Sequence, residues 1–410
     1  MTAAAPCIFT LFGATGNLAQ KKILPALSAL YCDGECVPGF EVIAFSRRPW
    51  TNEEYWSFAR PYLEGKNASP ATIDSFLKRI TYIQGEFGDP EAYTRLAEHI
   101  DQIDPANRSV KLFYLAIQPE FFETVAAGLS HAGFGKAGQK SERSKIMIEK
   151  PLGHSLETAR SLERSLESHL APEQILRVDH YLGKAGIQAM IEERRKNSEF
   201  ESRLNNKFVR EIRVRLFEKI DIEGRGELYD RLGALIDVGQ NHVLEMLAAA
   251  TMNLPKNGED SVSRTAIISM LKPPRPEKNV RAQYEGYRTE PDVGHNSTTE
   301  TYFSLETEID TPRWRGVRII LEAGKALPVS TSDVAFIFKD GTSKIFDIQA
   351  RTGLKNQDAY EIIIEKAIAN DPTYFVSMDE VSASWKFIES VRAGFHSRRL
   401  RVYESGSLPQ

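Results

Sequence analysis

The feature that most constrains the fold is a strand, a glycine turn and a helix at the start of the chain. Residues 7–12 form a short apolar run with β propensity that ends in Gly13-Ala14-Thr15-Gly16-Asn17-Leu18, and residues 21–30 show helical apolar spacing. Two glycines here let the backbone approach a pyrophosphate, and the helix start supplies N–H groups and a favourable dipole end. This pattern predicts a dinucleotide loop; the alternative is a tight β–α turn that needs glycine only for its dihedral angles.

The following apolar runs continue this alternation of strands and helices. Further strands are expected at residues 40–45, 110–116 and 145–148, whereas the stretch 51–108 is polar and helical in character. Such alternation gives a mostly parallel sheet with helices on both faces, and ligands bind at the carboxyl ends of its strands. The sequence therefore predicts a Rossmann-type, doubly wound α/β domain over residues 1–178.

Basic residues follow two of these expected strands. Arg47 and Arg48 stand where a dinucleotide fold contacts the adenosine ribose, and an arginine there suits a 2′-phosphate, so the pair favours NADP over NAD. Lys150, held by Pro151, ends another strand and could touch both cofactor and substrate. The alternatives are a solvated arginine pair and a surface lysine.

The character of the sequence changes near Asp179. Residues 208–217, 298–309 and 317–321 alternate apolar and polar side chains, as half-exposed strands do. The pattern predicts a β+α domain over residues 179–410, with a mainly antiparallel or mixed sheet and helices on one face.

The densest group of polar side chains lies in the segment Arg177–Lys184. If this segment is a turn that runs into a helix, His180, Tyr181 and Lys184 share one face. Their donors would then form charge-assisted hydrogen bonds to one phosphate. The alternative is a capped helix start with an exposed basic face.

Asp179, in the same segment, needs a different partner because a carboxylate repels a phosphate. A helix expected to begin near Asp237 carries His242 about one turn inside, followed by apolar residues. Alone, His242 is most simply a core histidine. Beside Asp179 it becomes a general base, because the carboxylate fixes the tautomer of the imidazole. Such a base suits the oxidation of an alcohol by a nicotinamide cofactor.

Composition argues against several functional classes. The 410 residues carry a formal charge of −4, which is unlike a nucleic-acid-binding protein. No segment approaches about 18 unbroken apolar residues, so we expect no membrane span. The cysteines Cys7, Cys32 and Cys36 indicate thiols in a reducing compartment and, without a companion Cys/His pair, make a poor metal site. We expect a cytoplasmic protein without a metal.

Together these motifs resemble the glucose-6-phosphate dehydrogenase family. The resemblance implies oxidation of glucose 6-phosphate to 6-phosphogluconolactone with reduction of NADP, by a homodimer or homotetramer. It covers most of the chain and rests on the glycine turn, Arg47, residues 114–119, 149–153, 177–184, 223–226, 237–242 and 324–327.

The resemblance also implies roles for individual residues. His242 would take the proton from the C1 hydroxyl of the sugar, and Asp179 would orient it. The residues that would bind the substrate are His180, Tyr181 and Lys184 for the phosphate, and Lys150, Glu218, Asp237 and Lys325 for the sugar hydroxyls. Those that would bind the cofactor are Gly13, Thr15, Gly16, Asn17, Leu18, Arg47 and Lys150.

Three departures from the family pattern leave the substrate open. Ser330 replaces a second basic residue, Gln118 stands where proline is common, and the stretch between Ser330 and Asp358 is short. The alternatives are a paralogous dehydrogenase of a modified hexose 6-phosphate, such as an amino sugar phosphate, and a catalytically silent homologue. A sugar oxidoreductase of the inositol-dehydrogenase type would share Glu-Lys-Pro, but its Gly-x-Gly-x-x-Gly loop is absent here.

Overall fold

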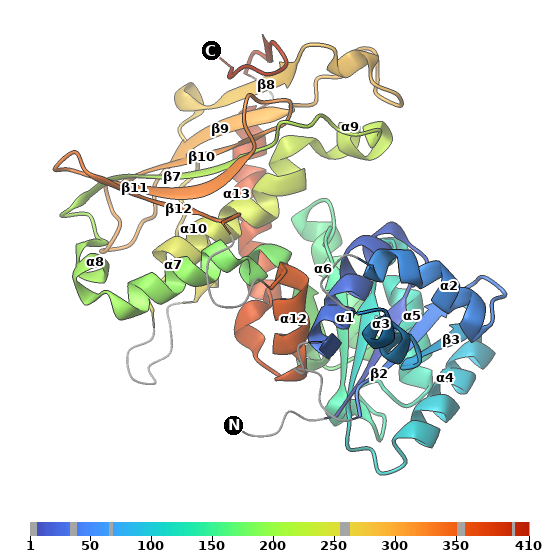
Figure 1. The fold of residues 1–410 in the computed structure, drawn as a ribbon. Coiled ribbons are helices and arrows are strands. Elements are labelled where there is room, and N and C mark those ends of the chain that lie inside the picture. The colour runs from blue at the N-terminus through green and yellow to red at the C-terminus, as the bar shows by residue number, and fades with distance from the viewer. Residues whose placement is uncertain are drawn as a thin grey trace. The chain divides into compact units, whose positions relative to one another are not determined.

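The computed structural model shows a chain that forms two compact units (Figure 1). The residues it describes are 6–32, 39–64, 69–254, 263–350, 357–395 and 398–409. The first unit comprises Met1–Leu152, Arg160–Gly183 and Gln357–Val376, and the second comprises Gly153–Ala159, Lys184–Asn356 and Ser377–Gln410. The units thus divide between residues 183 and 184, where the sequence suggested 178 and 179, and a late segment returns to the first unit.

A six-stranded parallel sheet forms the centre of the first unit. The strand order is β3-β2-β1-β4-β5-β6, and each neighbouring pair is parallel. This is the order of doubly wound dinucleotide-binding folds, so the predicted Rossmann-type architecture is confirmed. The strands are β1 (Cys7–Phe12), β2 (Glu41–Ser46), β3 (Ile80–Gln84), β4 (Val110–Leu115), β5 (Ser144–Glu149) and β6 (Ile175–Val178).

Both faces of this sheet are covered by helices. In β1, Phe9 and Leu11 pack into one core and Ile8 and Phe12 into the other. Because both faces are buried, the strand is apolar except for Thr10. The first core includes side chains of α1 (Leu24–Cys32), α2 (Asn52–Leu63), α3 (Pro70–Leu77) and α12 (Ala359–Ile368), and the second those of α4 (Pro90–Ile103), α5 (Phe122–His131) and α6 (Leu156–His169).

Two elements of the first unit depart from the prediction. The stretch 51–108, expected to be helical, contains the edge strand β3, whose short Ile-Thr-Tyr-Ile-Gln sequence gives little apolar signal. Helix α12, assigned from the sequence to the second domain, packs beside α1 (Figure 1).

Cys7 is buried in β1 and Cys32 is exposed, whereas Cys36 lies outside the described residues.

A seven-stranded mixed sheet forms the second unit, in the order β12-β11-β7-β10-β9-β8-β13. The pairs β7–β10 and β8–β13 are parallel and the other four are antiparallel, which confirms the mainly antiparallel prediction. Its strands are β7 (Val209–Phe217), β8 (Val280–Tyr284), β9 (Tyr302–Thr307), β10 (Arg318–Gly324), β11 (Thr331–Phe338), β12 (Ser343–Asp347) and β13 (Arg401–Tyr403).

The helical segments of this unit include the one that carries His242. Residues 185–203 form two consecutive helices, α7 and α8. The segments are α7 (Ala185–Lys196), α8 (Ser198–Arg203), α9 (Gly226–Ala234), η6 (Leu235–Val243), α10 (Leu244–Thr251), α11 (Arg264–Ser269) and α13 (Met378–Phe395). Within the described part of the chain, no helix combines the length and apolar character needed to cross a bilayer.

Candidate active site

The glycine turn follows β1 and is tied to the ends of two other strands. Gly13 has a φ of +74°, and a Cβ there would lie 2.5 Å from the carbonyl oxygen of Ala116, after β4. Glycine is therefore required both by the backbone angle and by the close approach. The amide of Gly16 donates to the carbonyl of Gly13 at 2.8 Å, and the hydroxyls of Thr15 and Ser46, at the end of β2, are hydrogen-bonded at 3.0 Å.

This turn borders a hollow of about 720 Å³ at the carboxyl ends of four adjacent strands, β3, β2, β1 and β4. Ligands of doubly wound sheets bind at this edge. The lining residues are Gly13, Thr15, Gly16, Ser46, Arg47, Arg48, Gly85, Glu86, Phe87, Gly88, Ala116, Ile117, Gln118, Phe121 and Thr124. Among the seven predicted cofactor residues, the lining includes Gly13, Thr15, Gly16 and Arg47.

The other predicted cofactor residues lie outside this lining. Asn17 is exposed at the start of the helix, and Leu18 packs against the core on the α1 side of the sheet. Lys150 is partly buried directly after β5.

Arg48 lies in the lining with its guanidinium 4.8 Å from the centre of the Trp50 ring, a cation–π distance that restrains this side chain.

Substitution of Gly13 by alanine is expected to impair dinucleotide binding and stability together. A left-handed backbone angle in a non-glycine residue costs about 1–3 kcal/mol, and the new Cβ would meet Ala116. The melting temperature should fall and the cofactor KM should rise. Gly394→Ala is a suitable control, because its Cβ would have only ordinary contacts, at 3.8 Å from Pro276. A Gly13→Ala variant with unchanged melting temperature would contradict this account.

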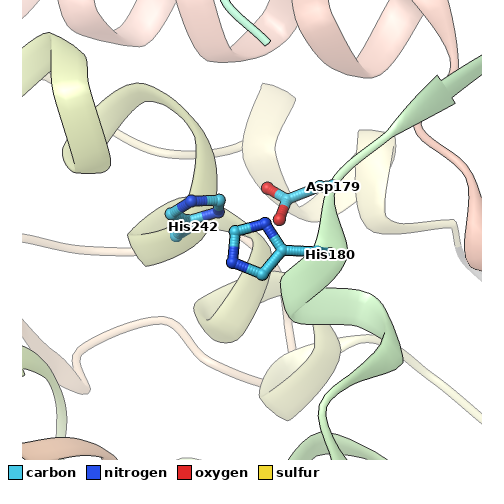
Figure 2. A group of neighbouring side chains, drawn as sticks. All are labelled: Asp179, His180 and His242. Atoms are coloured by element: carbon cyan, nitrogen blue, oxygen red, sulfur yellow. The ribbon is translucent and has the colours of Figure 1, made fainter. Parts of the chain in front are cut away.

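The polar segment Arg177–Lys184 begins on β6. Asp179 and Tyr181 are buried, at 4% and 7% exposure, and His180 is partly exposed. Figure 2 shows Asp179 and His180 leaving the chain at consecutive positions after this strand. The Oδ1 atom of Asp179 accepts a hydrogen bond from the amide of Tyr181 at 2.9 Å, so the carboxylate itself starts the next turn.

The predicted single helical face of this segment is not formed. His180–Gly183 make a separate short turn, η5, while Lys184 has an extended backbone (φ −64°, ψ 132°) and caps α7. The spacing rule that places residues i and i+4 on one face holds only within a continuous helix. It therefore does not apply to His180 and Lys184.

A buried carboxyl group, Glu149, ends β5, the strand that pairs with β6. It accepts a hydrogen bond from the phenol of Tyr114 on β4 and is also hydrogen-bonded to Tyr360 on α12. Burial raises the pKa of Glu149 to about 7. No role was predicted for these three residues, although each lies in a segment that carries the family resemblance or borders the shortened stretch. Glu149, Tyr114 and Tyr360 come together because α12, late in the chain, packs on the first unit. Local sequence patterns do not reveal this long-range contact.

In the second unit, Glu218 and Lys325 meet at the ends of two parallel strands. Phe217 of β7 is in register with Gly324 of β10, so the next residue of each strand lies at the same edge. The Nζ atom of Lys325 is 2.5 Å from Oε2 of Glu218, and Lys325 is only 2% exposed. This pair supplies fixed polar groups at one sheet edge, as predicted sugar ligands require.

Asp237 and His242 both lie on η6, which begins at Leu235, close to the predicted start. Asp237 is partly exposed, whereas His242 is 3% exposed; Figure 2 shows its ring projecting from the helix. The backbone amide of His242 donates to Oδ1 of Asn241 at 2.7 Å. Tyr229 is buried nearby, and its pKa is raised by burial and then by the charge of Asp237.

Models of one protein family match nearly the whole chain. Residues 10–189 match the family model "Glucose-6-phosphate dehydrogenase, NAD binding domain", and residues 191–356 and 345–409 match "Glucose-6-phosphate dehydrogenase, C-terminal domain". The chain belongs to the glucose-6-phosphate dehydrogenase family. The resemblance inferred from the motifs is thereby confirmed.

Individual members of the glucose-6-phosphate dehydrogenase family are similar over almost their full lengths. Glucose-6-phosphate 1-dehydrogenase of Chlamydia muridarum is 30% identical, over 94% of this chain and 90% of the relative. The enzyme of that name from Bacillus subtilis is 29% identical, over 98% and 94%. A solved structure of a glucose-6-phosphate dehydrogenase in complex with its substrate glucose-6-phosphate has a TM-score of 0.91 at 26% identity, covering 99% of this chain and 96% of that one.

The match to the family's C-terminal domain is interrupted. Its two pieces overlap at residues 345–356, as expected for a chain that lacks a segment in the middle of this domain. The alignment with the Bacillus subtilis relative spans 469 positions, more than the 410 residues of this chain. The overlap lies within the stretch between Ser330 and Asp358 where the shortening was inferred, and the alignment length agrees with gaps in this chain.

Proposed function

We propose that this chain oxidises glucose 6-phosphate at C1, with NADP as the hydride acceptor, and releases 6-phosphogluconolactone. Family membership over almost the whole chain is the observation that carries the proposal. The first unit also fits a dinucleotide: the close approach at Gly13 leaves no room for a side chain, and the hollow lies at the binding edge of the sheet. When bound, NADP supplies the acceptor for the hydride.

In this proposal, His242 is the general base and Asp179 its orienting partner. His242 removes the proton of the C1 hydroxyl as the hydride leaves C1. A carboxylate on the other ring nitrogen holds the required tautomer and stabilises the imidazolium that forms. Asp179 is suited to this task because it is buried and its position is fixed by the Tyr181 amide.

The remaining site residues bind the substrate by charge and hydrogen bonding. His180, Tyr181 and Lys184 donate to the phosphate, where charge-assisted hydrogen bonds are the strong kind. The sugar hydroxyls are bound by a set that contains both donors and acceptors: Lys150, Glu218, Asp237 and Lys325. The ammonium of Lys325 has three donors, so its bond to Glu218 leaves donors for a sugar.

Arg47→Ala is expected to raise the KM for NADP by about tenfold or more, the loss of one hydrogen bond to a charged group. The KM for NAD, which lacks the 2′-phosphate, should change little. Steady-state kinetics with each cofactor check this, with Arg164→Ala, an exposed arginine on α6, as the control. Equal increases for both cofactors would show that Arg47 does not select NADP.

The substrate is tested by NADPH formation from glucose 6-phosphate, glucosamine 6-phosphate and free glucose. We expect the highest kcat/KM with glucose 6-phosphate. Ser330 favours the paralogue as the second candidate, because a neutral hydroxyl that accepts from the amide of Lys219 at 2.9 Å replaces a basic residue of the family pattern. Turnover of the amino sugar phosphate without turnover of glucose 6-phosphate would select that candidate, and no turnover of any would favour a silent homologue.

We further propose that the enzyme is a cytoplasmic homodimer or homotetramer. The support is the family resemblance and the absence of a secreted cysteine framework. Light scattering on the purified protein measures the oligomeric state; a monomer at all concentrations would contradict it.

A further inference from the structure

The mechanism proposed above makes no use of the buried carboxyl of Glu149. Its side chain lies inside the first unit, between strands and a helix that come from distant parts of the sequence. Tyr114 from β4 and Tyr360 from α12 are both hydrogen-bonded to it. Glu149 is 8% exposed, Tyr114 0% and Tyr360 6%. A carboxyl with two phenol partners in so dry a place restrains both rings.

Tyr360 links this carboxyl to a predicted phosphate ligand. Its ring stacks on the imidazole of His180, with centroids 5.5 Å apart and planes 14° apart. The ring of Tyr181 is a second neighbour of His180, with centroids 5.1 Å apart and planes tilted by 56°. Helix α12 also approaches this turn closely, since a Cβ on Gly183 would lie 2.5 Å from the carbonyl oxygen of Ala359. The imidazole is thus packed against a ring that Glu149 holds.

We propose that Glu149 is a positioning residue for the substrate phosphate: through Tyr360 it holds the ring of His180 in the orientation that donates to the phosphate. The inference rests on the phosphate role proposed for His180. Glu149 itself touches neither substrate nor cofactor in this arrangement, so its loss should change the KM for glucose 6-phosphate more than kcat.

The charge state of Glu149 adds a pH dependence to this role. Burial raises its pKa to about 7, and the charge of Asp179 also raises it. Hydrogen bonds from Tyr114 and Tyr360 and the charge of Lys150 act in the opposite direction. Below pH 7 the neutral acid predominates. Above it, a second buried anion joins Asp179 and opposes a phosphate dianion, so substrate affinity should fall as pH rises through this value.

The test is the KM for glucose 6-phosphate, measured on both sides of pH 7 in the parent, Glu149→Gln and Glu149→Ala. The amide keeps hydrogen bonds without ionising, so Glu149→Gln should retain the low KM and lose the increase above pH 7. Glu149→Ala releases Tyr360 and should raise the KM by about 3–10-fold at every pH, the range of an aromatic contact, with kcat nearly kept. Tyr360→Phe keeps the stacked ring but loses its hydrogen bond to Glu149, so it should raise the KM in the same direction as Glu149→Ala; a KM equal to that of the parent would overturn the positioning through Tyr360.

A stability measurement keeps the inference testable if the alanine variant does not fold. Because the pKa of Glu149 is raised in the folded state, its contribution to stability is present at acidic pH and is lost as pH rises toward 7. The melting temperature of Glu149→Gln relative to the parent should therefore be more favourable at pH 8 than at pH 5. A difference that does not vary with pH would overturn the predicted ionisation.

His180→Ala separates the two levels of the proposal. If this variant leaves the KM for glucose 6-phosphate unchanged, the phosphate role of His180 fails and the inference fails with it. If His180→Ala raises the KM but Glu149→Ala does not, only the positioning role is overturned. A Glu149→Gln variant with the pH profile of the parent would likewise overturn the titration assigned to Glu149.

Discussion

Replacing His242 with alanine is expected to lower kcat for glucose 6-phosphate oxidation by about 10²–10⁴-fold, the usual contribution of a general base. The KM for NADP should be nearly unchanged, since the predicted cofactor residues all lie in the first unit and His242 lies on η6 of the second. Steady-state kinetics measure both values. The acidic limb of the kcat/KM pH profile should also disappear, because this limb reports protonation of the base.

The matched control for this variant is His295→Ala. His295 is exposed and in the same unit, so kcat should be that of the parent. Melting temperatures of both variants establish that the loss is not one of folding. Full activity of His242→Ala would show that this residue is not the general base. Inactivity of the parent protein would instead favour a catalytically silent homologue.

Replacing Lys184 with alanine is expected to raise the KM for glucose 6-phosphate by about 10–100-fold, because a hydrogen bond between charged groups contributes about 1.5–3 kcal/mol. Lys184 caps α7 with an extended backbone and has no predicted contact with the reacting carbon. Its loss should therefore reduce substrate binding while kcat is largely kept. Kinetics over a wide range of substrate concentration separate the two constants.

Lys196→Ala provides the comparison, since Lys196 is an exposed lysine at the other end of the same helix. Free glucose is a second control, because a substrate without a phosphate should not distinguish Lys184→Ala from the parent. A fall in kcat at constant KM would refute the assignment of Lys184 to the phosphate.

The sequence predicts the first unit well because of how its sheet is buried. Strands such as β1 and β4 are covered on both faces, so nearly all of their residues are apolar and the strands are easily recognised. The glycine turn is equally visible because Gly13 has a left-handed backbone angle. Strand β3 was missed, since a short edge strand with threonine and glutamine lacks this signal.

The site is less predictable because it depends on long-range contacts. The local spacing of His180 and Lys184 suggested one helical face, but His180 belongs to a separate turn, η5, which the Asp179 carboxylate starts and which ends before Lys184. Tyr360 stacks on His180 only because a segment 180 positions later in the chain packs on the first unit. The periodicity of apolar residues shows which side chains share a face of one helix or strand. It does not show which distant segment packs against that element.

The central claim is tested most directly by a crystal structure of the enzyme soaked with glucose 6-phosphate and NADP. The account predicts His242 within hydrogen-bond distance of the C1 hydroxyl, Asp179 on its other ring nitrogen, and the phosphate bound by His180, Tyr181 and Lys184. A sugar bound elsewhere, or an Asp179 carboxylate far from the His242 ring in that complex, would contradict it.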